Sequence, residues 1–211
     1  MDAHRICLVG GGVRSGKSAF AVDLALRLGA RRAFIATATR SDDEMDARIE
    51  RHRRDRRDAF VTVEAPVAVA DALSSLEGYD VVVIDCLTLW LSNLMVQRRS
   101  DERDGAAEAV LAQVDALARV LARRRLHAVL VTNEVGMSVH PPTAIGRAFV
   151  DLSGWAHQRL SRVADEIYLA VIGTVLRVRP GPVEVVAPRV AGGEAGSACA
   201  VERSGDEEAG G

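Results

Sequence analysis

The chain has 211 residues, 48% of them hydrophobic and 27% charged, which is typical of a folded globular protein with a substantial core. Its 27 basic residues nearly balance 29 acidic ones, and a net charge of −2 gives no reason to expect a nucleic-acid partner. No apolar run approaches the roughly 18 residues that span a membrane, and three distant cysteines without a CxxC pair suit a reduced, cytoplasmic protein.

Strand-like apolar runs alternate with helical segments along the sequence. We expect strands at 6–9, 32–38, 60–64, 80–85, 127–132, 166–172 and 175–178. We expect helices at 19–28, 66–76, 87–95, 106–125 and 143–164, with a polar segment at 41–55. Alternation of this kind predicts an α/β fold with a mostly parallel sheet and helices on both faces, in which ligands bind at the carboxyl ends of the strands.

The run 80–85 is continuously apolar until its final acid, which predicts a strand buried on both faces of the sheet. From residue 180 onward glycine, alanine, glutamate, serine and proline dominate and the apolar periodicity fades. We therefore expect one domain over residues 1–180 and a disordered tail over 181–211.

The pattern G-x-x-x-x-G-K-S follows the first strand and precedes the first helix, as a phosphate-binding loop requires. Lys17 within it is the single lysine of the chain, since all 26 other basic residues are arginines. A compact ammonium fits between phosphates where a planar guanidinium does not. The predicted nucleotide-binding residues of this loop are Gly11, Gly12, Val13, Arg14, Ser15, Gly16, Lys17 and Ser18.

Two acidic or hydroxyl side chains are candidates for Mg²⁺ binding. Ser18 would ligate the ion directly, and Asp85 ends an apolar strand, where P-loop enzymes place the acid that holds Mg²⁺ through water. The alternative for Asp85 is an N-cap of the following helix. Thr132 to Gly136 also follows a strand, so its polar groups either bind substrate or cap the next element.

His52 lies in an arginine-dense segment, 48–57, that allows three interpretations. A charged, solvated helix that contains one histidine is the simplest. Neighbouring cations would also keep the imidazole neutral and nucleophilic, with arginines to bind a polyphosphate. A basic patch for RNA is the third, but no aromatic side chains interleave with the arginines to stack on bases.

Beyond the loop, several blocks make the chain resemble the bifunctional adenosylcobinamide kinase / adenosylcobinamide-phosphate guanylyltransferase family of cobalamin synthesis. The resemblance covers about residues 5–178. Its most specific parts are Asp43-Glu44-Met45 with Ala47-Arg48-Ile49, and Thr132-Asn133-Glu134-Val135-Gly136. The other matching blocks begin at Phe34, His52, Asp85, Arg147, Gln158 and Asp165.

The resemblance implies a RecA-like P-loop fold and two reactions. In the first, ATP or GTP phosphorylates the aminopropanol hydroxyl of adenosylcobinamide. In the second, a histidine attacks the α-phosphate of GTP, pyrophosphate leaves, and GMP passes to adenosylcobinamide phosphate to give adenosylcobinamide-GDP. The family's nucleophile aligns with His52, which reverses the simplest interpretation of that segment, and Lys17 is the second catalytic residue.

The same resemblance extends the nucleotide site, with Glu64 placed to accept the N–H donors of guanine. The further nucleotide-binding residues it implies are Ala36, Thr37, Ala38, Arg53, Arg54, Asp55, Arg56, Glu64 and Asp85. It also implies Mg²⁺ as cofactor, a corrinoid substrate and a homotrimer. Two departures stand out, because Arg51 replaces a histidine that some members have and His157 stands where asparagine commonly precedes Gln-Arg.

Two rival functions remain at this stage. The chain could guanylylate only, without kinase activity. It could also be a P-loop NTPase switch or assembly factor that hydrolyses nucleotide when a macromolecule binds and forms no covalent nucleotide.

Overall fold

In the computed structural model, the residues described are 4–39, 59–99 and 105–186. Within these ranges no helix is both long enough and apolar enough to cross a membrane. The strands are β1 Ile6–Gly11, β2 Arg32–Ala36, β3 Val61–Glu64, β4 Val81–Asp85, β5 His127–Val131, β6 Glu166–Val171, β7 Thr174–Arg179 and β8 Glu184–Val186. The helices are α1 Lys17–Leu28, α3 Val69–Ser75, α4 Leu87–Arg99, α5 Ala106–Arg123 and α6 Ala144–Ser161.

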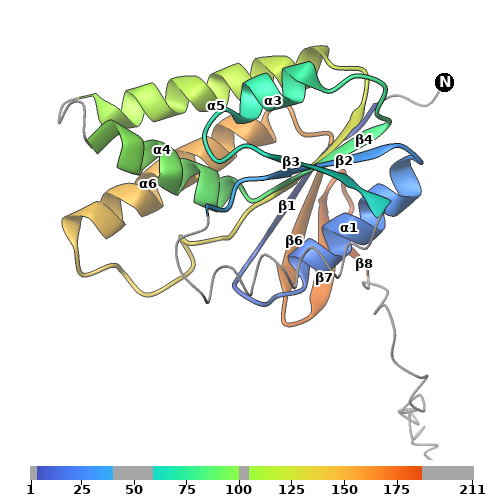
Figure 1. The fold of residues 1–211 in the computed structure, drawn as a ribbon. Helices are drawn as coiled ribbons and strands as arrows, with labels where there is room; N and C mark the ends of the chain where they lie inside the picture. The colour runs from blue at the N-terminus through green and yellow to red at the C-terminus, as the bar shows by residue number, and fades with distance from the viewer. Residues whose placement is uncertain (1–3, 40–58, 100–104, 187–211) are drawn as a thin grey trace, which may run out of the picture.

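All the strands belong to one sheet, in the order β3-β2-β4-β5-β1-β6-β7-β8 (Figure 1). The neighbouring strands from β3 to β6 pair in parallel, whereas β6 pairs with β7 and β7 pairs with β8 in antiparallel fashion. The prediction of a mostly parallel sheet is therefore confirmed. Because the six strands from β3 to β6 point the same way, their carboxyl ends form a single edge, where ligands of open α/β sheets bind.

Helices cover both faces of the sheet, as predicted: α1 lies on one side and α3, α4, α5 and α6 lie on the other (Figure 1). Strand β4 contributes side chains to the hydrophobic cores on both faces of the sheet. Val82 and Ile84 belong to the core under α3 to α6, whereas Val81 and Val83 belong to the core under α1. Successive side chains of a strand point to opposite faces, so a strand buried on both faces needs the continuous apolar run found here.

Several element boundaries differ from the sequence expectation, among them the start of α3 and the end of α4. The helix expected from residue 66 begins only at Val69, because the carbonyls of Pro66 and Val67 accept tertiary hydrogen bonds from Asn93 Nδ2 (2.9 Å) and Trp90 Nε1 (2.8 Å) of α4. The helix expected to end near residue 95 continues to Arg99. The late start of α3 arises from packing between segments, which sequence periodicity does not describe.

The domain also extends beyond residue 180. Strand β8, Glu184–Val186, pairs with β7, although the predicted tail began at residue 181. The Pro/Gly-rich turn that suggested disorder is the connection of a hairpin instead. Residues 187–211 lie outside the described residues, so a disordered tail there stays a prediction.

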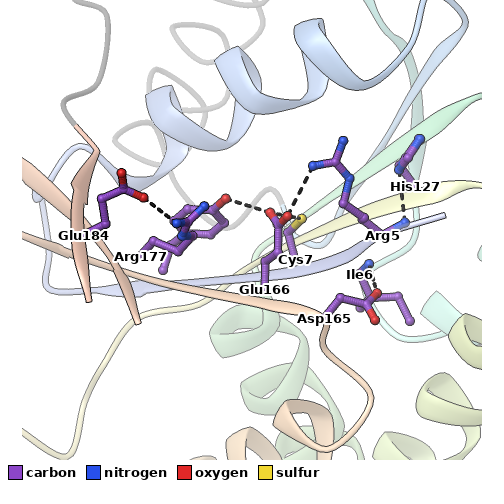
Figure 2. A network of polar contacts seen from close by, with 9 residues as sticks. Arg5, Ile6, Cys7, His127, Asp165, Glu166, Arg177 and Glu184 are labelled. Atoms are coloured by element: carbon purple, nitrogen blue, oxygen red, sulfur yellow. Dashed lines mark hydrogen bonds and ion pairs between the residues drawn. The ribbon is translucent and has the colours of Figure 1, made fainter. Parts of the chain in front are cut away.

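At the amino ends of the strands, a partly buried carboxylate joins β1 to β6 (Figure 2). Glu166 accepts hydrogen bonds from Tyr168 Oη (2.7 Å), Arg5 (3.2 Å) and Cys7 Sγ (3.5 Å). Burial alone would raise the pKa of Glu166, but these hydrogen bonds outweigh burial and leave the pKa lowered. The ionised carboxylate therefore stabilises the edge of the sheet opposite the strands' carboxyl ends.

We expect Glu166→Gln to lower the free energy of unfolding by about 1–3 kcal/mol at pH 7, because the Tyr168 hydroxyl and the Arg5 guanidinium lose a charged partner. Because the folded pKa is lowered, wild-type Glu166 stabilises the fold above its unfolded pKa of about 4.3. This stability is lost as pH falls through the folded pKa. Urea unfolding at pH 7 and below pH 4 should show the difference between the proteins shrinking in acid.

Glu184→Gln is the matched control, because Glu184 forms an exposed ion pair with Arg177 in the same region (Figure 2). An exposed pair contributes about 0–1 kcal/mol. Equal losses of stability in the two variants would contradict the account of Glu166.

Candidate active site

The phosphate-binding loop connects β1 to α1. At two of its positions the backbone has a conformation or a close contact that requires glycine. A side chain at Gly11 would place its Cβ 2.4 Å from the carbonyl oxygen of Ala170, so β6 closes against the start of the loop. Gly16, the residue before α1, has a φ of +93°, which side chains rarely adopt. These two glycines let the loop pass close to β6 and turn into the helix.

The N-terminus of α1 is built for an anion. No side chain caps it, and its first turn contains no acidic residue. Its first residue is Lys17, which is only 8% exposed and donates from Nζ to the carbonyl of Gly12 at 3.0 Å. A cation at the positive end of a helix dipole is unfavourable in isolation. A bound phosphate would make this cation favourable, because the phosphate would meet both the lysine and the N–H groups of the first turn.

Ser15 supplies a second sign of a missing ligand. Its hydroxyl oxygen is buried and has no hydrogen-bond partner among the described residues. Buried polar groups are nearly always bonded in native structures, and this one lies inside the phosphate-binding loop. An anionic ligand in the loop would provide the partner.

The loop and Asp85 offer oxygen donors suited to Mg²⁺. The Ser18 hydroxyl lies in the first turn of α1, and the Asp85 carboxylate ends β4, separated from β1 only by β5. Within the described ranges no three His, Cys, Asp or Glu residues form a metal cluster. Such a cluster is not required, because Mg²⁺ in nucleotide sites uses one or two protein ligands together with phosphates and water.

Glu64, Ala36 and Asp85 form one row across the sheet. Ala36 of β2 is in register with Glu64 of β3 on one side and with Asp85 of β4 on the other. Four strand spacings of about 4.8 Å separate β3 from the loop strand β1, or roughly 19 Å. The sheet therefore places the predicted guanine-binding acid at one end of this edge and the phosphate-binding loop toward the other.

Thr37 joins β2 to the residue after Asp85. Its hydroxyl donates to the carbonyl of Cys86 and accepts from the Cys86 N–H, each at 2.8 Å, while its own N–H donates to the carbonyl of Asp85. The side chain is fully buried. Burial raises the pKa of Cys86 to about 11; the Asp85 charge adds to this shift and the Lys17 charge opposes it. The Cys86 thiol is therefore protonated at pH 7. We expect Thr37 to fix the position of Asp85 rather than to contact nucleotide through its side chain.

Thr37→Val should lower the free energy of unfolding by about 2–4 kcal/mol, because two buried backbone groups lose their partner while the side-chain shape is kept. Urea unfolding at pH 7 measures the loss. Ser74→Ala is the control, since the Ser74 hydroxyl is exposed and bonds only back to its own helix at Ala70. A Thr37→Val protein as stable as Ser74→Ala would contradict the role given to Thr37.

A network at the end of β5 was not foreseen from the sequence. Thr132 Oγ1 lies 2.7 Å from His157 Nε2 of α6 and 3.3 Å from Thr88 Oγ1 of α4, and Thr88 accepts from the Asn133 N–H at 2.8 Å. The Glu134 N–H donates to the carbonyl of Gly11 at 3.0 Å. His157 shows no metal-ligand spacing, and only the fold brings α6 to this edge, so no sequence signal identifies its role.

The other predicted site residues fall into two groups. Ala38 is half-buried and follows Thr37 at the same edge, and Val13 and Arg14 lie in the loop with exposed side chains. The predicted catalytic histidine and its predicted nucleotide-binding neighbours fall in the range 40–58, outside the described residues: His52, Arg53, Arg54, Asp55 and Arg56.

Solved structures with a similar fold are distant in sequence. The ATPase EscN from the type III secretion system of enteropathogenic Escherichia coli matches with a TM-score of 0.52 and 13% identity, over 79% of this chain and 42% of EscN. A Pyrococcus horikoshii protein matches with a TM-score of 0.51 and 11% identity, over 90% of this chain and 95% of that one. The architecture is that of a P-loop NTPase, as the RecA-like prediction expected.

Sequence comparison is far more specific. A family model described as cobinamide kinase / cobinamide phosphate guanyltransferase matches residues 7–178. The bifunctional adenosylcobalamin biosynthesis protein CobP of Pseudomonas aeruginosa is 37% identical, over 83% of this chain and 98% of the relative. The bifunctional adenosylcobalamin biosynthesis protein CobU of Escherichia coli is 35% identical, over 82% of this chain and 98% of the relative. The chain belongs to the cobinamide kinase / cobinamide phosphate guanyltransferase family.

Proposed function

We propose that this chain phosphorylates adenosylcobinamide with ATP or GTP and then transfers GMP from GTP to the product, giving adenosylcobinamide-GDP and pyrophosphate. Its membership of a family with both activities supports the proposal. The structural observation that carries it is the N-terminus of α1, where a buried lysine meets a helix end without a cap or an acid. That site suits a nucleotide phosphate.

In the kinase step, Lys17 and the N–H groups of α1 would hold the β- and γ-phosphates. Ser18 and Asp85 are the residues that would hold Mg²⁺. The bound ion would neutralise part of the phosphate charge. The chain's own residues then orient the γ-phosphoryl group toward the substrate hydroxyl at the open carboxyl edge of the sheet.

In the guanylyl step, Glu64 would accept the N1–H and N2–H donors of guanine, which adenine does not offer in the same pattern. His52 would attack the α-phosphate and release pyrophosphate, with Arg53, Arg54 and Arg56 balancing the phosphate charge. The new P–N bond to the imidazole is reactive enough to pass GMP to the corrinoid phosphate. One displacement thereby becomes two easier ones.

The test uses GTP labelled at either the α- or the γ-phosphate, with Mg²⁺ and adenosylcobinamide. We expect the γ-label to appear first on the corrinoid, and the α-label to appear on the protein and then on the corrinoid. Phosphate release without either transfer would instead support the rival function, an NTPase switch or assembly factor.

The assembly and compartment are also proposed from the family resemblance. We propose a homotrimer that works in the cytoplasm without a nucleic-acid partner. Cys7 and Cys86 are buried free thiols, which agrees with a reducing compartment. Light scattering of the purified chain would measure the proposed assembly, and a monomer would contradict it.

A further inference from the structure

The end of β5 presents a carboxylate whose position is fixed from several directions. Strand β5 lies between the loop strand β1 and the Asp85 strand β4. Glu134 follows it, and the Glu134 N–H bonds to the carbonyl of Gly11, the first residue of the phosphate-binding loop. Its side chain is 31% exposed, so a substrate can reach it.

Two groups hold the carboxylate in place. Oε1 accepts from the Gly136 N–H at 3.1 Å, and Oε2 lies 3.7 Å from His157 Nδ1. The latter distance is longer than a hydrogen bond, so the contact is between a charge and the N–H dipole of the ring. The His157 side chain is only 14% exposed.

We assign to His157 the tautomer that makes its contacts one directed chain of hydrogen bonds. The Asn133 N–H donates to the Thr88 hydroxyl, which is placed to donate to Thr132, which is placed to donate to His157 Nε2. Each hydroxyl then donates once and accepts once. With Nε2 as an acceptor, the ring proton is on Nδ1 and faces Glu134. Burial lowers the pKa of His157, and the Glu134 carboxylate opposes only part of that shift, so the ring is neutral at pH 7.

We propose that Glu134 takes the proton from the substrate hydroxyl in the kinase step and that His157 is the positioning residue that holds Glu134 in place. The substrate oxygen bonds to the γ-phosphorus as the bond to the β–γ bridging oxygen breaks. The nucleoside diphosphate leaves, and the hydroxyl proton passes to the Glu134 carboxylate. This inference rests on the proposed kinase function.

The first test is Glu134→Gln, assayed as transfer of the γ-label of GTP to adenosylcobinamide by the full chain. We expect kcat to fall about 100-fold or more, the range for loss of a general base, while KM for GTP stays within about 3-fold because phosphate binding is unchanged. Transfer of the α-label to the protein should persist. Asp151→Asn, an exposed carboxylate on α6, is the control and should keep wild-type kcat.

The second test separates positioning from packing. His157→Asn carries an amide N–H near the place of Nδ1, where it can donate to Glu134 as the ring does, whereas His157→Gln places its amide toward Nε2 and Thr132. We expect kcat to fall about 10-fold in His157→Gln and in His157→Leu, and to stay within about 3-fold of wild type in His157→Asn. If His157→Leu does not fold, the comparison of the two amides still decides.

Two results would overturn the inference: a Glu134→Gln enzyme with kcat within about 3-fold of wild type, or equal kcat in His157→Gln and His157→Asn. Failure of the proposed function itself would look different from both results. If that function is wrong, the wild-type chain will transfer no γ-label to adenosylcobinamide.

Discussion

Lys17→Met should lower kcat/KM for phosphoryl transfer from GTP by at least about 100-fold. The reason is that the protein loses the preorganised positive charge that stabilises the transferred phosphoryl group. Methionine keeps the length and volume of the side chain but removes the ammonium that lies at the uncapped end of α1. Lys17→Arg should fare little better, since a planar guanidinium does not fit where a compact ammonium does. Transfer of the γ-label of GTP to adenosylcobinamide measures both.

Arg27→Met is the matched control, because Arg27 is an exposed cation in the last turn of the same helix. Thermal unfolding with and without Mg²⁺ and GTP separates binding from folding. Saturating GTP should raise the Tm of wild type and Arg27→Met but not of Lys17→Met. A Lys17→Met protein that GTP still stabilises fully would show that this loop is not the phosphate site.

His52→Ala should remove all covalent GMP from the protein and at least about 1000-fold of guanylyl transfer, because the group that forms the intermediate is gone. The kinase step should keep wild-type kcat, since it does not pass through that histidine. Incubation with Mg²⁺ and GTP labelled at the α-phosphate, followed by acid and by alkali, reports the bond. A phosphoramidate to histidine is acid-labile and alkali-stable.

His4→Ala is the control for loss of a histidine away from the site, because His4 lies at the amino ends of the strands beside His127. It should keep the full label. Label that survives in His52→Ala would move the nucleophile to another residue and contradict the alignment with the family.

Much of the fold follows from local pattern. The glycines, Lys17 and the flanking strand and helix predict the phosphate-binding loop, and the continuous run Val81–Asp85 predicts a strand buried on both faces. The start of α3 and the strand β8 could not be predicted in the same way. The first depends on bonds from Trp90 and Asn93 to the segment before α3, and the second on pairing with β7.

Some residues of the candidate site can likewise be predicted from the sequence, and others cannot. Ser18 and Asp85 follow from the loop and from the strand that ends in an acid. The meeting of Thr88, Thr132 and His157 does not, because three elements converge there and no spacing along the chain encodes it. The role proposed for His52 depends on the family resemblance, since an arginine-rich segment alone favours a solvated helix.

We expect this one chain to perform two successive transfers on a corrinoid. Mass spectrometry of adenosylcobinamide incubated with the enzyme, Mg²⁺ and GTP tests this most directly. The account predicts adenosylcobinamide phosphate first, then adenosylcobinamide-GDP with one pyrophosphate released per product. GTP consumed to GDP and phosphate while the corrinoid keeps its original mass would contradict it.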